Sequence, residues 1–248
     1  MKKKFKSYCL PLTILLLILF NACSDALDVI PKDQVSDAIM WNNTANADLF
    51  LNNIYGSVAG PNLADSWENY SDNAINGVAG QYSAIVFGEG NYTPANAPNL
   101  WGNYNNIRKA NLFIEKVTNS QLPDDWKMIR LAEARFLRAY FFTQLWNYYG
   151  GVPLITVVLS QAEQGEDIFY PRSSFEDTFR FITTELDEIA NDLPLQPETG
   201  RASRGAALTL KAWCELFAAS PLNNAENDLK KWESAAQTYQ RIIDLDVY

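Results

Sequence analysis

The sequence predicts an all-α protein built from paired helices. Apolar side chains recur at helical spacing through most of the chain beyond residue 99, and glycine, proline or serine marks the ends of these stretches. Hardly any stretch alternates apolar and polar residues as a strand does, and residues 83–87 and 155–159 are the only two weak candidates. The spacing of alanines and aromatic residues on two of the helices is typical of tetratricopeptide units. We therefore expect tetratricopeptide-like helix pairs joined by long loops.

The chain opens with the features of a secretory signal peptide. Four lysines lie within the first six residues, no acidic residue precedes Asp25, and residues 10–20 are almost entirely apolar. This apolar run is about half of the ~20 residues that a membrane-spanning helix needs, so we expect residues 1–22 to direct export and then be removed. The segment resembles a bacterial lipoprotein signal, in which the cysteine at the cleavage site is acylated. Cys23 would then anchor the chain in a membrane. The alternative is a signal peptide that ends near a cysteine by chance.

The rest of the chain divides into a tether and a helical domain. Residues 23–35 are short, polar and turn-rich, and Pro31 breaks any helix there, so we expect a tether between lipid and fold. Residues 36–248 form the predicted domain. Thr44 is the expected cap of a helix that runs to about Ser57. Residues 59–99 are rich in glycine, asparagine and aspartate and are predicted to be mainly loop.

Five further helices are expected after this loop. They cover residues 100–117, 123–149, 174–193, 203–220 and 226–244. The apolar side of the first is expected to carry Trp101, Tyr104, Ile107, Leu112 and Ile114. Pro123 fits the first turn of the second of these, and Gly150 with Gly151 marks its end. Ser173 with Glu176, and Ser174 with Asp177, both have the spacing of a capping box.

Two helices carry the tetratricopeptide spacing. Ala132, Phe136 and Ala139 match a second helix of such a unit, and Trp232, Ala235, Ala236 and Tyr239 match a first helix. A first helix needs a partner that covers its apolar face, and the sequence stops at Tyr248 soon after it. We therefore expect this sequence to be an incomplete chain.

Composition excludes several classes of function. Without residues 1–22 the chain has 16 basic and 29 acidic side chains, a formal charge of −13, which disfavours nucleic acid as a partner. Histidine is absent, so the usual general base, zinc ligand and catalytic triads are missing. Gly88 and Gly90 lack the rest of a phosphate-binding motif. Calcium binding stays open in a loop rich in aspartate and asparagine, although no twelve-residue ligand spacing occurs there. We expect no cofactor. Cys214 lies in an apolar helical stretch and is expected to be a buried structural thiol.

The loop holds the best candidates for ligand binding. Aromatic rings stack on sugar rings, and amide and carboxylate groups bond their hydroxyls, so the candidates combine both kinds of group. They are Trp67, Asn69, Tyr70, Asp72, Asn73 and Tyr82, with Asn91 and Tyr92 beside them. The aromatic residues of the helix that ends at Tyr149 recur at helical spacing and are expected to be core. Arg135 and Arg138 on the same helix are expected to bind helix ends or acidic neighbours and not a ligand.

Residues 133–153 read EARFLRAYFFTQLWNYYGGVP and resemble the signature of the SusD/RagB family of nutrient-binding outer-membrane lipoproteins. Other segments resemble family motifs in the expected order. They are residues 23–28, 31–33, 101–111, 170–174, 193–194 and 200–206. The resemblance covers nearly all of the chain after the signal peptide. Members are commonly about twice this length, so the chain corresponds to the amino-terminal half.

The resemblance implies a binding protein and not an enzyme. Members lie on the cell surface as a lid over a TonB-dependent transporter of the SusC type, and they capture glycans or, in some branches, peptides. Two other classes of function stay open on the residues alone. One is a helical scaffold that binds only proteins. The other is a glycoside hydrolase that uses two carboxylates, with Glu68 paired with Asp72 or Glu89.

Overall fold

The computed structural model describes residues 37–58, 90, 93–95 and 99–247. The chain divides into residues 1–40 and residues 41–248. Every regular element within the described ranges is a helix, which confirms the predicted all-α class. The predicted signal peptide and tether lie outside these ranges, as does most of the predicted loop, including the possible strand at residues 83–87.

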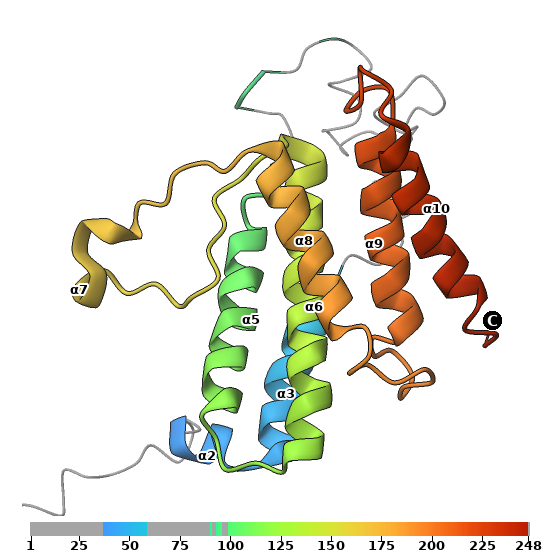
Figure 1. The fold of residues 1–248 in the computed structure, drawn as a ribbon. Coiled ribbons are helices and arrows are strands. Elements are labelled where there is room, and N and C mark those ends of the chain that lie inside the picture. The colour runs from blue at the N-terminus through green and yellow to red at the C-terminus, as the bar shows by residue number, and fades with distance from the viewer. Residues whose placement is uncertain (1–36, 59–89, 91–92, 96–98, 248) are drawn as a thin grey trace, which may run out of the picture. The chain divides into compact units, whose positions relative to one another are not determined.

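Figure 1 labels the α-helices in chain order. The elements are α2 (Asp37–Trp41), α3 (Thr44–Tyr55), α5 (Asn103–Thr118), α6 (Asp124–Tyr149), α7 (Gln161–Gln164), the 3-10 helix η3 (Gly165–Ile168), α8 (Phe175–Ile189), α9 (Arg204–Ala219) and α10 (Leu229–Ile243).

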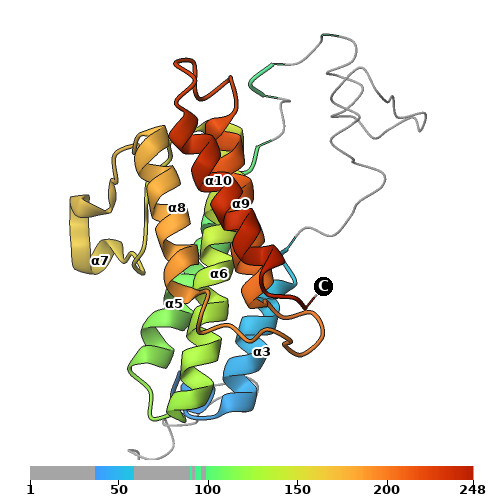
Figure 2. The same ribbon diagram turned by 45° about the vertical axis from the view of Figure 1, so that its right-hand side comes forward.

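Within residues 41–248, the long helices α5, α6, α8, α9 and α10 lie side by side and alternate in direction (Figures 1 and 2). Each packs on the next one along the chain, and α3 packs on α5 and α6. This is the arrangement of stacked helical hairpins that tetratricopeptide spacing predicts. Residues 153–172, which carry α7 and η3, leave the stack after α6 and return to it at the start of α8 (Figure 1).

Trp146 lies at the centre of the packing between α6, α8 and α9. Its fully buried ring contacts Phe175, Phe179 and Phe217, with ring centroids 4.7, 5.8 and 5.2 Å away. The indole N–H donates to the carbonyl of Phe175 at 3.1 Å, so the one polar atom of the ring is satisfied inside the core. Removing a core side chain of this size costs about 3–5 kcal/mol, so the stacking of these helices depends on it.

The apolar faces predicted for α5 and α6 agree only in part with the side chains that are buried. Ala132 and Ala139 of α6 are fully packed, as the tetratricopeptide spacing predicts, and Phe141 and Leu145 are buried. Tyr148, which was expected in the same core stripe, is 37% exposed. On α5 the buried apolar side chains are Ile107, Ala110, Phe113 and Val117, whereas Leu112 and Ile114 are only half-buried.

The starts of α3, α5 and α6 differ from the prediction. Asn43, not Thr44, caps α3, because its side-chain oxygen accepts from the backbone N–H groups of Ala45 at 2.8 Å and Asn46 at 3.3 Å. Pro123 precedes the first turn of α6 and does not lie within it. The first helix after the loop begins at Asn103, not at residue 100.

Serine and glycine signals predict the later boundaries well. Ser174 caps α8, since its hydroxyl oxygen accepts from the N–H of Asp177 at 2.9 Å. Ser203 caps α9 through the N–H of Ala206 at 3.0 Å, and α6 ends before Gly150. Two boundaries differ from the prediction. Helix α8 ends at Ile189 and not at residue 193, and α10 begins at Leu229 and not at residue 226.

Residues 155–159 form no strand, although their apolar composition made them a candidate. They run beside α5, and side chains take the place of a partner strand. Asn111 Nδ2 donates to two of their carbonyl oxygens, at 2.9 and 3.1 Å, and Arg108 donates to that of Leu159 at 2.5 Å. An extended segment thus satisfies its carbonyl groups without a sheet.

Candidate functional site

The predicted ligand-binding residues lie outside the described part of the chain. This holds for Trp67, Asn69, Tyr70, Asp72, Asn73 and Tyr82, for Asn91 and Tyr92, and for the predicted lipid anchor Cys23. Their roles stay predictions. The structure does describe the helices at both ends of the loop, and the start of α5 carries a group of aromatic side chains.

Trp101, Tyr104, Tyr148 and Tyr149 form this group, named here the Trp101 cluster. The ring of Trp101 stacks on Tyr149, with centroids 4.0 Å apart and 8° between the planes, and lies 6.2 Å from Tyr104. Tyr148 packs edge-on against Tyr149 at 4.9 Å. Trp101 is 47% exposed, so a large aromatic surface is held in place by ring contacts and still faces solvent.

The antiparallel packing of α5 and α6 builds the Trp101 cluster, because it brings the start of one helix beside the end of the other. The N–H of Leu100 donates to the hydroxyl of Tyr149 at 2.7 Å, and the hydroxyl of Tyr104 donates to the carbonyl of Pro153, also at 2.7 Å. Burial raises the pKa of Tyr104 to about 12, so this phenol stays protonated and keeps its bond at neutral pH.

The turn that follows α6 holds the last aromatic residue of the Trp101 cluster in place. Gly150 has a φ of +73°, which side-chain-bearing residues rarely adopt, and ends the helix directly after Tyr149. Arg172 donates to the carbonyl oxygens of Gly151, at 2.6 Å, and of Tyr149. The last aromatic residue of α6 is thereby tied to the segment that leads into α8.

Sequence reasoning missed the exposure of Trp101. It placed this residue on the apolar side of a helix that was expected to start at residue 100. Because α5 starts at Asn103, Trp101 precedes the helix and does not follow its buried face. The flanking Gly102, beside a loop with no helical periodicity, was the one available signal for a different position.

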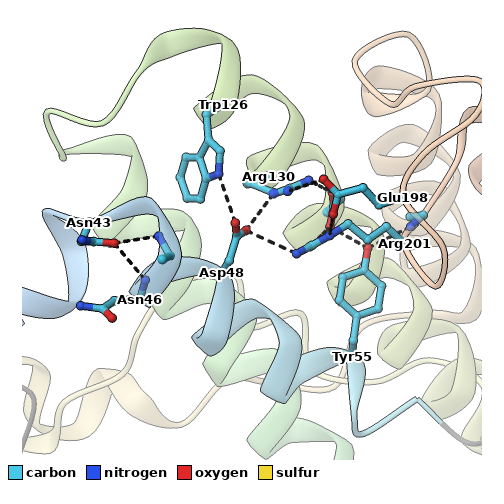
Figure 3. A network of polar contacts seen from close by, with 11 residues as sticks. Asn43, Asn46, Asp48, Tyr55, Trp126, Arg130, Glu198 and Arg201 are labelled. Atoms are coloured by element: carbon cyan, nitrogen blue, oxygen red, sulfur yellow. Dashed lines mark hydrogen bonds and ion pairs between the residues drawn. The ribbon is translucent and has the colours of Figure 1, made fainter.

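A second group of polar residues joins α3, α6 and the segment before α9 (Figure 3). Glu133 is at its centre and is fully buried. Its carboxylate accepts from Arg130 at 2.7 Å, from Arg201 at 2.8 Å and from the hydroxyl of Tyr55 at 2.9 Å. Burial, followed by the nearby charge of Glu133, raises the pKa of Tyr55, so its hydroxyl remains a donor.

Asp48 completes this Glu133 network. Its carboxylate accepts from Arg130 at 2.8 Å and from both Arg201 and the indole of Trp126 at 3.5 Å (Figure 3). The fully buried Glu133 and the half-buried Asp48 therefore have several donors each, two of them arginines. Glu133 and Asp48 thus tie three segments of the fold together through ion pairs.

Arg135 and Arg138 bind acidic neighbours, as predicted. Arg138 donates to both oxygens of Glu185, at 2.7 and 2.9 Å, and Arg135 donates to Glu185 at 2.6 Å and to Glu188 at 2.5 Å. These bonds tie α6 to α8. Neither arginine is available to a ligand at these atoms.

Cys214 is the buried structural thiol that the sequence predicts. It is completely buried on α9 beside Thr143, with 3.6 Å between the sulfur and the hydroxyl oxygen. Burial raises its pKa to about 12, so the reactive thiolate is scarce at neutral pH. In the part of the chain that the structure describes, no group of three potential metal-ligating side chains occurs. None of the described helices combines the length and the apolar character that crossing a membrane requires.

Comparison with known proteins identifies the family. A family model described as SusD-like, starch-binding and associating with the outer membrane matches residues 27–215. This range is well over half of the chain. The chain belongs to the SusD-like family. The resemblance carried by residues 133–153 is thus confirmed.

Other SusD-like proteins agree in sequence and in fold. A SusD-like protein of Formosa agariphila is 27% identical over 222 residues, which are 87% of this chain and 43% of the relative. A crystal structure of a SusD-like protein from Bacteroides fragilis is 28% identical, with a TM-score of 0.67, over 84% of this chain and 41% of that one. A SusD-like carbohydrate-binding protein from the same species is 29% identical, with a TM-score of 0.65 and the same coverage.

The SusD-like chain described here spans less than half the length of these relatives. What a whole protein of the family binds and assembles with is therefore a matter for proposal. The residues of the Trp101 cluster and of the Glu133 network all lie within the range that the family model matches.

Proposed function

We propose that this chain captures an oligosaccharide at the cell surface and hands it to a TonB-dependent outer-membrane transporter of the SusC type. One observation carries the glycan part of this proposal. In a chain whose family is described as starch-binding, the Trp101 cluster exposes aromatic surface at the end of a loop that itself carries candidate sugar ligands.

The chemistry of the cluster suits sugar binding. The C–H faces of a pyranose ring pack on aromatic rings, and an exposed ring that is already held by its neighbours loses little conformational freedom on binding. Asn105, exposed on the first turn of α5, offers an amide that both donates to and accepts from hydroxyl groups. Stacking and hydrogen bonding of this kind bind a ligand without making or breaking a covalent bond.

The ion-paired carboxylates of the described helices are not available for glycoside hydrolysis. A glycoside hydrolase needs two carboxyl groups that are free to act on a substrate. Asp48 and Glu133 are bound by arginines, as is Glu185. The pair suggested by the sequence, Glu68 with Asp72 or Glu89, lies outside the described residues.

A gel-retardation assay with soluble starch, and with laminarin as a second glycan, tests capture directly. We expect the mobility of the chain to fall in at least one gel that contains the polysaccharide, with no new reducing ends after prolonged incubation. Release of reducing sugar that disappears in a Glu68→Gln variant would replace this proposal by a hydrolase.

Cellular fractionation tests the anchor and the transporter. We expect the wild-type chain in the outer-membrane fraction and a Cys23→Ser variant in the soluble fraction, because two or more acyl chains are needed for stable anchoring. Cys214→Ser is the matched control and should stay with the membrane. If detergent extracts of the wild type never contain a large β-barrel protein bound to it, the transporter part of the proposal is wrong.

A further inference from the structure

Every arginine of the chain lies in the described part of the structure, and most of them are ion-paired. The paired ones are Arg130, Arg135, Arg138, Arg180, Arg201 and Arg241. Arg108, Arg172 and Arg204 pair with no carboxylate among the described residues and donate only to backbone carbonyl groups. Two of these three, Arg108 and Arg172, lie beside the Trp101 cluster.

Arg108 lines a pocket that continues from the cluster. The pocket has a volume of about 220 Å³ and lies between α5 and the extended residues 155–159. Tyr104, Asn105 and Arg108 line it from α5, and Ile155, Val157 and Leu159 line it from the extended segment. Tyr104 belongs to both the cluster and the pocket, so the two form one surface. A volume below that of sites for drug-sized ligands suits one unit of a longer glycan.

The guanidinium group of Arg108 is held in place but only partly used. Its Nη1 donates to the carbonyl oxygen of Leu159 at 2.5 Å, which engages one of its five N–H donors. The side chain is exposed. Arg108 follows Tyr104 by four residues on α5, so its charge lies one helical turn from that aromatic ring.

Arg172 brings a second guanidinium group to the cluster. It is exposed and donates to the carbonyl oxygens of Gly151, at 2.6 Å, and of Tyr149, which leaves further donors unused by the described residues. The rings of Tyr149 and Tyr104 are the two that stack with Trp101. Each tyrosine that stacks with the exposed tryptophan therefore has an arginine next to it.

The segments that build the cluster and the pocket carry no opposing charge. Residues 99–114 and 139–162 contain no acidic residue, although the chain without residues 1–22 has 29 acidic side chains and 16 basic ones. The protein as a whole repels anions, so any attraction for an anion at this place is local. A guanidinium group matches a carboxylate best, because the two form a pair of parallel hydrogen bonds.

We propose that the glycan captured at the Trp101 cluster is acidic, and that Arg108 and Arg172 bind the carboxylates of uronic acid units next to the unit that stacks on Trp101. This inference rests on the proposed glycan capture and names its substrate class. In the pocket, the side chains of Ile155 and Val157 pack on the apolar face of the sugar ring while Arg108 binds its carboxylate. A neutral glucan still stacks on the aromatic rings, but with lower affinity.

Isothermal titration calorimetry of the full chain tests the proposal. Soluble starch and laminarin are each used in native form and after oxidation of their C6 hydroxyl groups to carboxylates, so that both forms share one backbone. We expect an affinity about fivefold higher for the oxidised form, since one exposed ion pair contributes up to about that factor. Equal or weaker binding of the oxidised form would overturn the acidic class and leave glycan capture intact. Absence of binding with every preparation would contradict glycan capture itself.

Arginine variants assign the preference to its residues. We expect Arg108→Gln to lower the ratio of the two affinities about twofold or more, with native glycan bound as before, and the double variant with Arg172→Gln to abolish the preference. Arg204→Gln is the matched control, because it removes the same charge from an arginine that also donates only to carbonyl groups. An unchanged ratio in Arg108→Gln and in the double variant, or an equal loss in Arg204→Gln, would overturn the assignment.

Salt and sulfate separate this proposal from its rivals. The preference for the oxidised form should shrink in about 0.5 M sodium chloride, because salt screens exposed charges, whereas stacking on Trp101 should persist. A preference that salt leaves unchanged would contradict an ionic contact. Tighter binding of sulfated starch than of oxidised starch would make this a sulfate site and overturn the assignment of a carboxylate.

Discussion

Glu133 connects three segments that are distant in sequence. Tyr55 from α3, Arg130 from its own helix and Arg201 from the segment before α9 all donate to its carboxylate. A buried charge is tolerated only while its partners remain, so the position of each segment depends on the other two.

The cost of breaking this contact is predictable. We expect Glu133→Gln to lower the free energy of unfolding by about 1–3 kcal/mol, because the amide loses the charge-assisted bonds to Arg130 and Arg201, which keep Asp48 as an anionic partner. The measurement is urea unfolding at pH 7, followed by circular dichroism. Glu115→Gln, exposed on α5, should change stability by less than about 0.5 kcal/mol. Equal effects of the two variants would contradict the proposed role of the network.

At the scale of single residues, the sequence predicted the kind of contact that a side chain makes but not its partner. Acidic partners for Arg135 and Arg138, and burial of Cys214, follow from charge and periodicity and were predicted. The partners themselves, Glu185 and Glu188, could not be named, because they lie about fifty residues away and meet the arginines only once α8 packs on α6.

At the scale of elements, the turn between α6 and the residues that follow it decides how the Trp101 cluster is held. Gly151 is in close contact with the backbone that leads into α8. A Cβ at this position would lie 2.0 Å from the carbonyl oxygen of Ser173. Backbone cannot move aside as a flexible side chain can, so only glycine fits.

A pair of glycine variants tests this turn. We expect Gly151→Ala to destabilise the chain by at least ~1–3 kcal/mol, because the methyl group overlaps backbone atoms. Gly102→Ala should be neutral or stabilising by about 0.5–1 kcal/mol, because its backbone is helical and a Cβ there meets no atom within 4 Å. Thermal unfolding of both variants is the measurement, and a smaller loss for Gly151→Ala than for Gly102→Ala would refute the close contact.

Helix boundaries that are set by nearby capping or stop residues were predictable, and elements that depend on partners distant in sequence were not. Ser174, Ser203 and Gly150 act through atoms within a few residues, so their sequence signals suffice. Residues 155–159 have the composition of a strand, but side chains of α5 and α6 satisfy their carbonyl groups instead. Helices α7 and η3, with no buried residue of their own, leave no apolar pattern to detect.

At the scale of the whole molecule, the helical stack and the family were both predictable, because each depends on patterns repeated along the chain. The ligand site was predictable only in outline. Trp67 and its neighbours were selected for their chemistry, and they lie outside the described residues. Trp101 was available in the sequence but was assigned to the packed side of α5. Its exposure depends on where that helix starts.

Gel retardation of tryptophan variants by the polysaccharide that retards the wild type, with starch tried first, tests the central claim most directly. We expect Trp101→Ala to weaken binding about tenfold or more, since a central aromatic anchor carries much of the affinity of a site. Trp213→Ala is the matched control, because Trp213 on α9 is 38% exposed and also stacks on a neighbouring ring. Unchanged binding by Trp101→Ala, or an equal loss for Trp213→Ala, would contradict the claim that the Trp101 cluster is the glycan-binding surface.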